Sequence, residues 1–288
     1  MYDSKKHSLY KQMEVESVIS NVFSTYFRNF LPLFIISFVG VFIVQLFIYS
    51  TGFYDVLNDF DPAIVEGNLG FFMKLILKMM LIMIVVYGIL NAFLINYLFV
   101  KDIDSNVSFT SILGDSLRKF SVHMVFFMIL TMIIIMVGMI FGVIVFVVGM
   151  LLAALYLGSV LISGCSVVVV EQKNAFDAIG RSFSLSHKDF WQSLGSFVLF
   201  VLIMILISIV LSAVVAIPVV IMFFDKLGET GSIFEAFNLK LYDIGIWSAI
   251  INSFVSALIY PLYAIFSLVL YLKLKYIEDR RANIDVVE

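Results

Sequence analysis

The chain has 288 residues, of which 62% are hydrophobic and 14% charged, and its formal net charge is −3. Soluble domains carry about 25% charged residues, so this composition excludes an ordinary soluble domain, and the negative balance excludes a strongly basic nucleic-acid-binding protein. A single cysteine, Cys165, excludes a disulfide within the chain. We therefore expect an all-α, polytopic membrane protein.

Six apolar segments are long enough to cross a bilayer, which takes about 20 residues of helix. No charged residue or histidine occurs from Met124 to Val170, and this run is expected to turn within Gly138–Gly149. Pro218 and Pro261 are the expected kinks in spans five and six, because proline lacks the N–H that a helix uses. The predicted spans are approximately 30–50, 75–100, 122–143, 147–170, 194–224 and 247–272.

An amphipathic segment precedes spans one, three and five, at about 15–30, 109–120 and 174–191. Each segment places apolar side chains on one helical face. We interpret each as a helix lying in the membrane interface, followed by a two-span hairpin. Any interfacial helix that leads into a span would show this periodicity, so internal repetition is a hypothesis. The positions that align are Phe23, Leu117 and Phe183, with Ile19, Leu113 and Ile179.

Three such units predict one integral membrane domain over residues 1–288, built as a compact bundle with a collar of interfacial helices. Neutral polar residues in the spans, Asn91 and Asn96 among them, are expected to form hydrogen bonds between helices. Small residues such as Gly142 and Gly164 should allow close helix contact. The repeat-like units are about 13–100, 107–170 and 174–275, with a cytoplasmic tail at 276–288.

Positive charge sets the predicted orientation. Most of the 18 Lys and Arg residues lie on the side that holds the termini. The exceptions are Lys74, Lys78, Lys226 and Lys240. An excess of Lys and Arg marks the cytoplasmic side of a membrane protein. Both termini are therefore predicted to be cytoplasmic, in the inner membrane of a bacterium.

The stretch Val167–Val170, Glu171 and AFDAIGRSFSLSHKDFW resembles a bacterial six-span group. This group includes the membrane domain attached to some glycerophosphodiester phosphodiesterases, together with uncharacterised relatives. The resemblance implies a six-helix membrane fold and no phosphodiesterase activity, since the catalytic part of those enzymes is a separate soluble domain. Leu272 and Lys273 stand where the group has an acidic residue after the tyrosine of its last span. The matching positions are Glu171, Ala178, Arg181, Ser182, Leu185, Phe190 and Trp191, then Pro261, Tyr271 and Arg280–Arg281.

Glu171 and Arg181 are the candidate structural clamp. A turn at 172–174, with Asn174 as helix N-cap, would fold Glu171 back onto Arg181 and fasten the third amphipathic helix to span four. The chain shows no metal-ligand spacing of Cys and His and no G-x-S-x-G, H-E-x-x-H or Walker motif. We therefore predict no catalytic, cofactor-binding or metal-binding residues.

Four basic residues are candidates for lipid headgroup or anion contacts. Lys74 and Lys78 share one helix face near the outer end of span two. Their side chains are expected to reach the outer headgroups, with a cationic entrance for an anionic solute as the alternative. Arg118 and Lys119 are placed to contact inner-leaflet phosphates.

The leading hypothesis is a non-enzymatic scaffold or accessory subunit that binds lipids and a membrane-protein partner, or a second copy, through its cytoplasmic interfacial helices. The alternative is a transporter or lipid-handling permease with a central cavity between the repeats. A third is a membrane enzyme acting on headgroups near Lys74 and Lys78. It would require a nearby acid or base from the first outer loop, which offers Asp55, Asp59, Asp61 and Glu66.

Overall fold

The structure is a computed structural model that describes residues 2–51, 69–144, 146–230 and 246–285. Every regular element in these ranges is helical. Six helical segments are long and apolar enough to span a membrane, which confirms the predicted all-α, polytopic fold. These segments are Phe30–Ser50, Gly70–Ile103, Phe109–Val143, Val147–Val170, Ala175–Ile217 and Ala249–Asn283.

The chain begins with a short 3-10 helix, η1 (Ser4–Lys6), then α1 (Val15–Arg28) and the first span, α2 (Phe30–Ser50). Asn29 separates α1 from α2, and its backbone N–H bonds back to the last turn of α1. Pro32 stands in the first turn of α2, where a missing N–H is tolerated. The amphipathic and apolar helices are therefore distinct elements.

Each of the three predicted amphipathic segments forms a short helix directly before a span. Span four is broken between α8 and α9, and the last helix continues past residue 276, where the tail was predicted, to Asp285. The remaining elements are α5 (Leu69–Ile103); α6 (Phe109–Asp115), the π-helical turn η2 (Ser116–Phe120) and α7 (Ser121–Val143); α8 (Phe146–Leu161) and α9 (Gly164–Val170); α10 (Ala175–His187) and α11 (Phe190–Thr230); and α13 (Ile246–Asp285).

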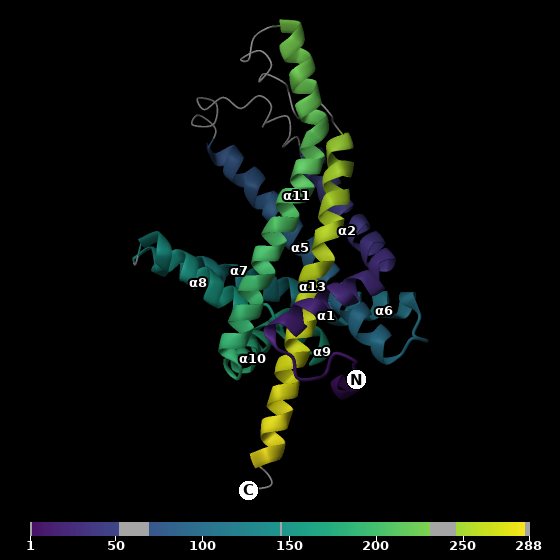
Figure 1. Cartoon of the computed structure of the whole chain (residues 1–288), viewed down its shortest axis with the longest axis vertical. Helices are drawn as coiled ribbons and strands as arrows, with labels where there is room; N and C mark the ends of the chain where they lie inside the picture. Colours follow the sequence, from purple (N-terminus) through teal and green to yellow (C-terminus); the bar gives the residue numbers. More distant parts are fainter. Residues whose placement is uncertain (1, 52–68, 145, 231–245, 286–288) are drawn as a thin grey trace.

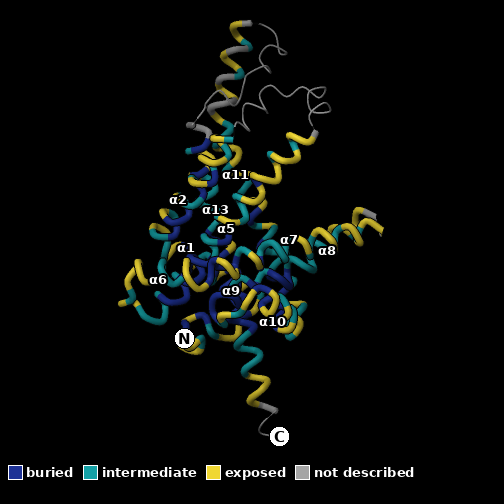
Figure 2. Tube along the Cα trace, turned by 180° about the vertical axis from the view of Figure 1, so that it is seen from behind, coloured by how far each residue is buried: buried dark blue, intermediate teal, exposed yellow. Residues whose placement is uncertain are grey.

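Both termini lie at one end of the molecule, together with α1, α6, α9 and α10 (Figure 1). We call this the collar end. From there α2, α11 and α13 run together in one direction, whereas α7 and α8 lean away as a pair (Figures 1 and 2). This arrangement differs from the compact bundle expected from the sequence. Apolar side chains are equally well solvated by lipid tails, so no hydrophobic force draws the spans together along their whole length.

Buried residues concentrate at the collar end (Figure 2). There α13 is the central helix, because every side chain from Ala264 to Leu274 is buried. It packs against α1, α2, α5, α9, α10 and α11. The most apolar window of the α13 span is 67% buried, against 11% for the spans that contain α7 and α11. The folded core is therefore a collar built around the C-terminal half of α13.

Polar side chains join the spans at two predicted positions. Asn91 Nδ2 donates to Tyr260 Oη at 2.5 Å, which links α5 to α13. Asn96 Nδ2 donates to Ser116 Oγ at 3.0 Å, which links α5 to η2. The expected hydrogen bonds between helices are confirmed at both residues.

Glycines allow two close approaches, as predicted. A Cβ at Gly164 would lie 2.3 Å from the ring of Phe127, and one at Gly142 would lie 2.6 Å from the carbonyl oxygen of Gly149. Real Cβ atoms do not come so near to other heavy atoms, so both contacts require glycine. The first fastens α9 to α7, and the second holds α7 against α8.

The two prolines do not interrupt their helices. Pro261 is buried within α13, which is helical on both sides of it. Position 218 lies inside α11, and its side chain is outside the described part of the chain. The kinks expected at these prolines stay predictions.

Candidate functional site

Glu171 and Arg181 meet at the collar end. Arg181 Nε lies 3.0 Å from both carboxylate oxygens of Glu171. The chain reverses after Glu171 through Gln172, whose φ of 54° is left-handed and costs an ordinary residue about 1 kcal/mol. Asn174 then caps α10 by accepting the backbone N–H of Asp177 at 3.0 Å. The turn at 172–174 therefore brings the carboxylate back onto α10.

A second carboxylate, Glu278 of α13, completes this arrangement. Arg181 Nη1 donates to Glu278 Oε1 at 2.8 Å, and Nη2 donates to Oε2. Lys188 and Lys275 reach the same carboxylate at 2.6 and 2.9 Å. Paired N–H donors on one carboxylate give the strong, oriented contact that arginine favours. We call Glu171, Arg181, Lys188, Lys275 and Glu278 the collar cluster.

The collar cluster fastens α10 to α13 as well as to α9. The sequence predicts only the contact of Arg181 with Glu171. Tyr271, also on α13, donates its hydroxyl to Glu171 Oε1 at 3.2 Å. Glu278 lies 97 residues beyond Arg181, so no local spacing pattern could have paired them.

The N-terminal segment is joined to the same helix. Tyr10 Oη donates to Asp279 Oδ2 at 2.7 Å, and Arg280 donates to Gln12 at 2.8 Å. Burial, together with the Asp279 carboxylate, raises the pKa of the Tyr10 hydroxyl. The hydroxyl therefore remains a donor across the physiological range.

Lys273 carries a charge into the interior of the collar. Its side chain is 0% exposed, and its ammonium nitrogen lies 3.0 Å from Asp189 Oδ2 and 3.0 Å from Gln192 Oε1. A buried ammonium requires a paired carboxylate, since leaving water costs several kcal/mol. This pair joins α13 to the start of α11.

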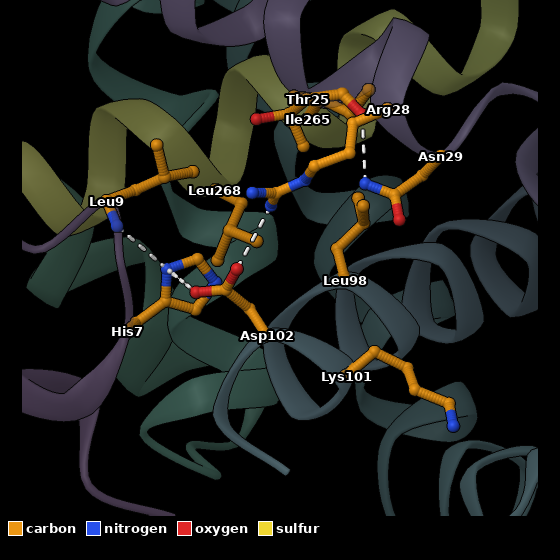
Figure 3. Close-up of a pocket in the computed structure, with 10 residues that line it drawn as sticks. All are labelled: His7, Leu9, Thr25, Arg28, Asn29, Leu98, Lys101, Asp102, Ile265 and Leu268. Carbon is orange, nitrogen blue, oxygen red and sulfur yellow. Dashed lines mark hydrogen bonds and ion pairs between the residues drawn. The ribbon is translucent and has the colours of Figure 1, made fainter. Parts of the chain in front are cut away.

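A cavity of about 190 Å³ lies at the collar end, between the N-terminal segment, α1, α5 and α13 (Figure 3). Leucines and Ile265 form its apolar walls. Its polar lining comprises His7, Thr25, Arg28, Asn29, Lys101 and Asp102. We call it the N-terminal pocket.

Asp102 is the central acceptor of this pocket. It takes the backbone N–H of Ser8 at 2.7 Å and the Nη2 of Arg28 at 3.0 Å. His7 Nδ1 lies 3.3 Å from the same carboxylate and accepts the N–H of Leu9 at 3.1 Å. Burial lowers the pKa of His7, and the Asp102 carboxylate opposes that shift. The ring is therefore neutral at neutral pH, in agreement with its role as an acceptor.

The predicted headgroup contacts fall into two separate places. Lys74 and Lys78 are exposed on the part of α5 that points away from the collar (Figure 1). Arg118 and Lys119 are exposed on η2 at the collar end, where Lys119 pairs with Asp115 at 2.8 Å. The loop acids proposed to act with the two outer lysines lie outside the described residues: Asp55, Asp59, Asp61 and Glu66.

Within the described ranges, no group of three or more His, Cys, Asp and Glu side chains could hold a metal ion. Comparison of the chain with protein families, curated proteins and solved structures found no match. The resemblance to the six-span group therefore stays a prediction. The chemistry of the collar is ion pairing and hydrogen bonding between helices.

Proposed function

We propose that the protein is a non-enzymatic scaffold or accessory subunit of a bacterial inner membrane, which binds partner proteins or lipids through its collar end. The main support is the concentration of ionic contacts there. The collar cluster fixes α10 and α13 in one geometry, as a binding surface requires. Transporters and pumps instead place ionisable groups inside their spans.

The orientation proposed for the protein puts the collar in the cytoplasm. Both termini lie at the collar end (Figure 1). That end also carries the basic residues of α10 and α13, among them Lys188 and Lys275. An excess of Lys and Arg near span ends favours the cytoplasmic side.

The short helices of the collar are proposed to lie at headgroup level. α10 buries the small residues Ala178 and Ser182 against the core and leaves Phe176 74% exposed. Trp191, in the first turn of α11, is 79% exposed. Exposed aromatic rings next to span ends are typical of the membrane–water interface. The outward aromatic face of α10 supports an interfacial helix.

The end of α13 offers a surface to a cytoplasmic partner. It projects beyond the other helices of the collar end (Figure 1). Arg280 and Arg281 are exposed on this projection. Because Glu278 anchors its base to α10, the projection has a fixed direction relative to the membrane. We propose it as the part that a partner protein contacts.

Affinity purification from bacterial membranes in mild detergent tests this function. Mass spectrometry would record the proteins and lipids that copurify with the wild type, with Arg181→Gln and with the exposed control Lys11→Gln. We expect a stoichiometric protein or an enriched lipid with the wild type and the control, and its loss with Arg181→Gln. Recovery of nothing beyond what an unrelated six-span protein retains would overturn the proposal.

A lipid-handling permease is the second candidate, favoured by a groove on α11. The groove has a volume of about 420 Å³ and is lined by Ser208, Ser212 and Tyr263, among others. Labelling Ser208→Cys in a Cys165→Ser background with a membrane-impermeant thiol reagent tests it. Labelling from water would favour a permease, and complete protection would favour the scaffold.

A further inference from the structure

The N-terminal pocket lies where two spans meet the membrane surface. α2 begins one residue after Asn29, and α5 ends one residue after Asp102. Arg28 is the last residue of α1, just before α2, and Lys101 lies in the last turn of α5. The ends of apolar spans coincide with the headgroup layer, which carries the lipid phosphates. The polar lining of the pocket is therefore at phosphate depth.

The charges of the pocket favour an anion. Arg28 and Lys101 contribute two positive charges against the single carboxylate of Asp102, since His7 is neutral. Lys101 donates to the backbone carbonyl of Ser105 at 2.8 Å, and its ammonium points away from Asp102 (Figure 3). It therefore acts by its field rather than as a direct ligand.

Arg28 is placed to be the direct ligand. Its side chain is 58% exposed, and Asp102 takes one of its two terminal nitrogens. A guanidinium carries five N–H donors, so further donors remain for a bidentate contact with phosphate oxygens. Asp102 is itself oriented by the backbone N–H of Ser8 at 2.7 Å. The pocket thus holds the arginine in place before a ligand arrives.

The surroundings of Arg28 fit a lipid better than a free ion. Phe27 and Leu31, on either side of this junction, are 70% and 64% exposed. They offer apolar contact to acyl chains at the same depth. The cavity of about 190 Å³ corresponds to about six water molecules, at about 30 Å³ each, which leaves room for a small headgroup.

We propose that the N-terminal pocket binds the phosphate of an anionic phospholipid, with Arg28 as its principal ligand. This inference rests on the proposed function, because it requires the collar to face the headgroups. A phosphate oxyanion could also come from solution, and the experiment separates the two sources. Lys11 provides the control, since it is an exposed basic residue at the collar end that does not line the pocket.

Native mass spectrometry of the full-length protein in detergent tests the inference. Short-chain phosphatidylglycerol and phosphatidylcholine would be titrated separately into the wild type, Arg28→Gln, Arg28→Lys and Lys11→Gln. We expect phosphatidylglycerol binding to weaken about tenfold in Arg28→Gln, the cost of one charged hydrogen bond, and to be unchanged in Lys11→Gln. The affinity of Arg28→Lys for phosphatidylglycerol should lie between those of the wild type and Arg28→Gln, because lysine keeps the positive charge but lacks the paired N–H donors of arginine.

A second arm measures the melting temperature of the same variants with inorganic phosphate. Stabilisation that depends on Arg28, without lipid selectivity, would assign the site to free phosphate. Melting without any ligand shows whether each variant is folded. Equal phosphatidylglycerol and phosphate responses in wild type and Arg28→Gln would overturn the inference. If the wild type still recovers a partner in the affinity purification, only the inference about the N-terminal pocket is overturned. If the wild type recovers neither a partner nor a lipid there, the proposed function is overturned as well.

Discussion

The collar end and the distant halves of the spans are held together by different forces. The helix α13 packs against six other helices, and at the collar end it is tied to α10 by the collar cluster. By contrast, the most apolar windows of the spans that contain α7 and α11 are only 11% buried. Water at the collar end makes apolar burial favourable, whereas lipid tails solvate apolar helices without cost. The stability of this protein is therefore expected to reside mainly in the collar.

Removing Arg181 should produce the largest loss. Arg181→Met would leave Glu171 and Glu278 facing each other with 14% and 15% of their side chains exposed. Breaking a largely buried ion pair costs about 3 kcal/mol in the free energy of unfolding. Denaturation in mixed detergent micelles measures it. The double variant Arg181→Met, Glu278→Gln should recover part of the loss, and a change within about 0.5 kcal/mol for the single variant would contradict a structural role.

A methyl group at Gly164 should have the next largest effect. Its Cβ would lie 2.3 Å from the ring of Phe127, and that ring is itself buried. Overpacking of this kind costs about 2 kcal/mol, which the same unfolding measurement detects. Gly70→Ala is the control in the distant half of α5, because no atom lies within 4 Å of its added Cβ. Equal losses in the two variants would remove the distinction between collar and distant halves.

Protonation of His7 should loosen the N-terminal segment by a smaller amount. Because folding lowers its pKa, the unfolded chain takes up the proton at higher pH than the folded one. The contribution of the neutral His7 ring to the free energy of unfolding is fully present above its ordinary pKa of 6.5. This contribution declines as the pH falls below that value. We expect this loss to be smaller than those at Arg181 and Gly164, because the Asp102 carboxylate partly compensates the charge.

Limited proteolysis of the N-terminal segment at about pH 7.5 and about pH 5.5 measures this effect. Cleavage before α1 should accelerate at the lower pH in the wild type. The variant His7→Gln should show a smaller acceleration than the wild type, because other titrating groups act equally in both proteins. The same acceleration in His7→Gln would assign the pH dependence to another group.

Neutralising the lysines of the distant half should have the smallest effect. Lys74 and Lys78 are exposed on α5, away from the collar end. Surface substitutions of this type change the free energy of unfolding by less than about 0.5 kcal/mol. The double variant Lys74→Gln, Lys78→Gln should therefore melt like the wild type. A loss comparable with that of Arg181→Met would show that the distant half carries a structural charge site.

The sequence by itself determined the elements that depend on local pattern. Apolar length defined the six spans, since a crossing helix must be uniformly apolar. Asn29 and Pro32 mark the boundary between α1 and the span α2, and Asn174 caps α10. The contact of Glu171 with Arg181 was also within reach, because only a short turn separates the two residues.

Only the tertiary structure decided which of these elements meet. Glu278 and Lys273 lie far along the chain from their partners. The sequence around a single acid or lysine near the end of a span does not predict which residue it contacts. The N-terminal pocket draws His7, Arg28 and Asp102 from three segments. The sequence also does not predict that α7 and α8 lean away together from the other spans, because lipid and protein solvate an apolar helix face equally well. Local pattern sets where a helix begins and ends, whereas the balance of lipid, water and distant charges sets its neighbours.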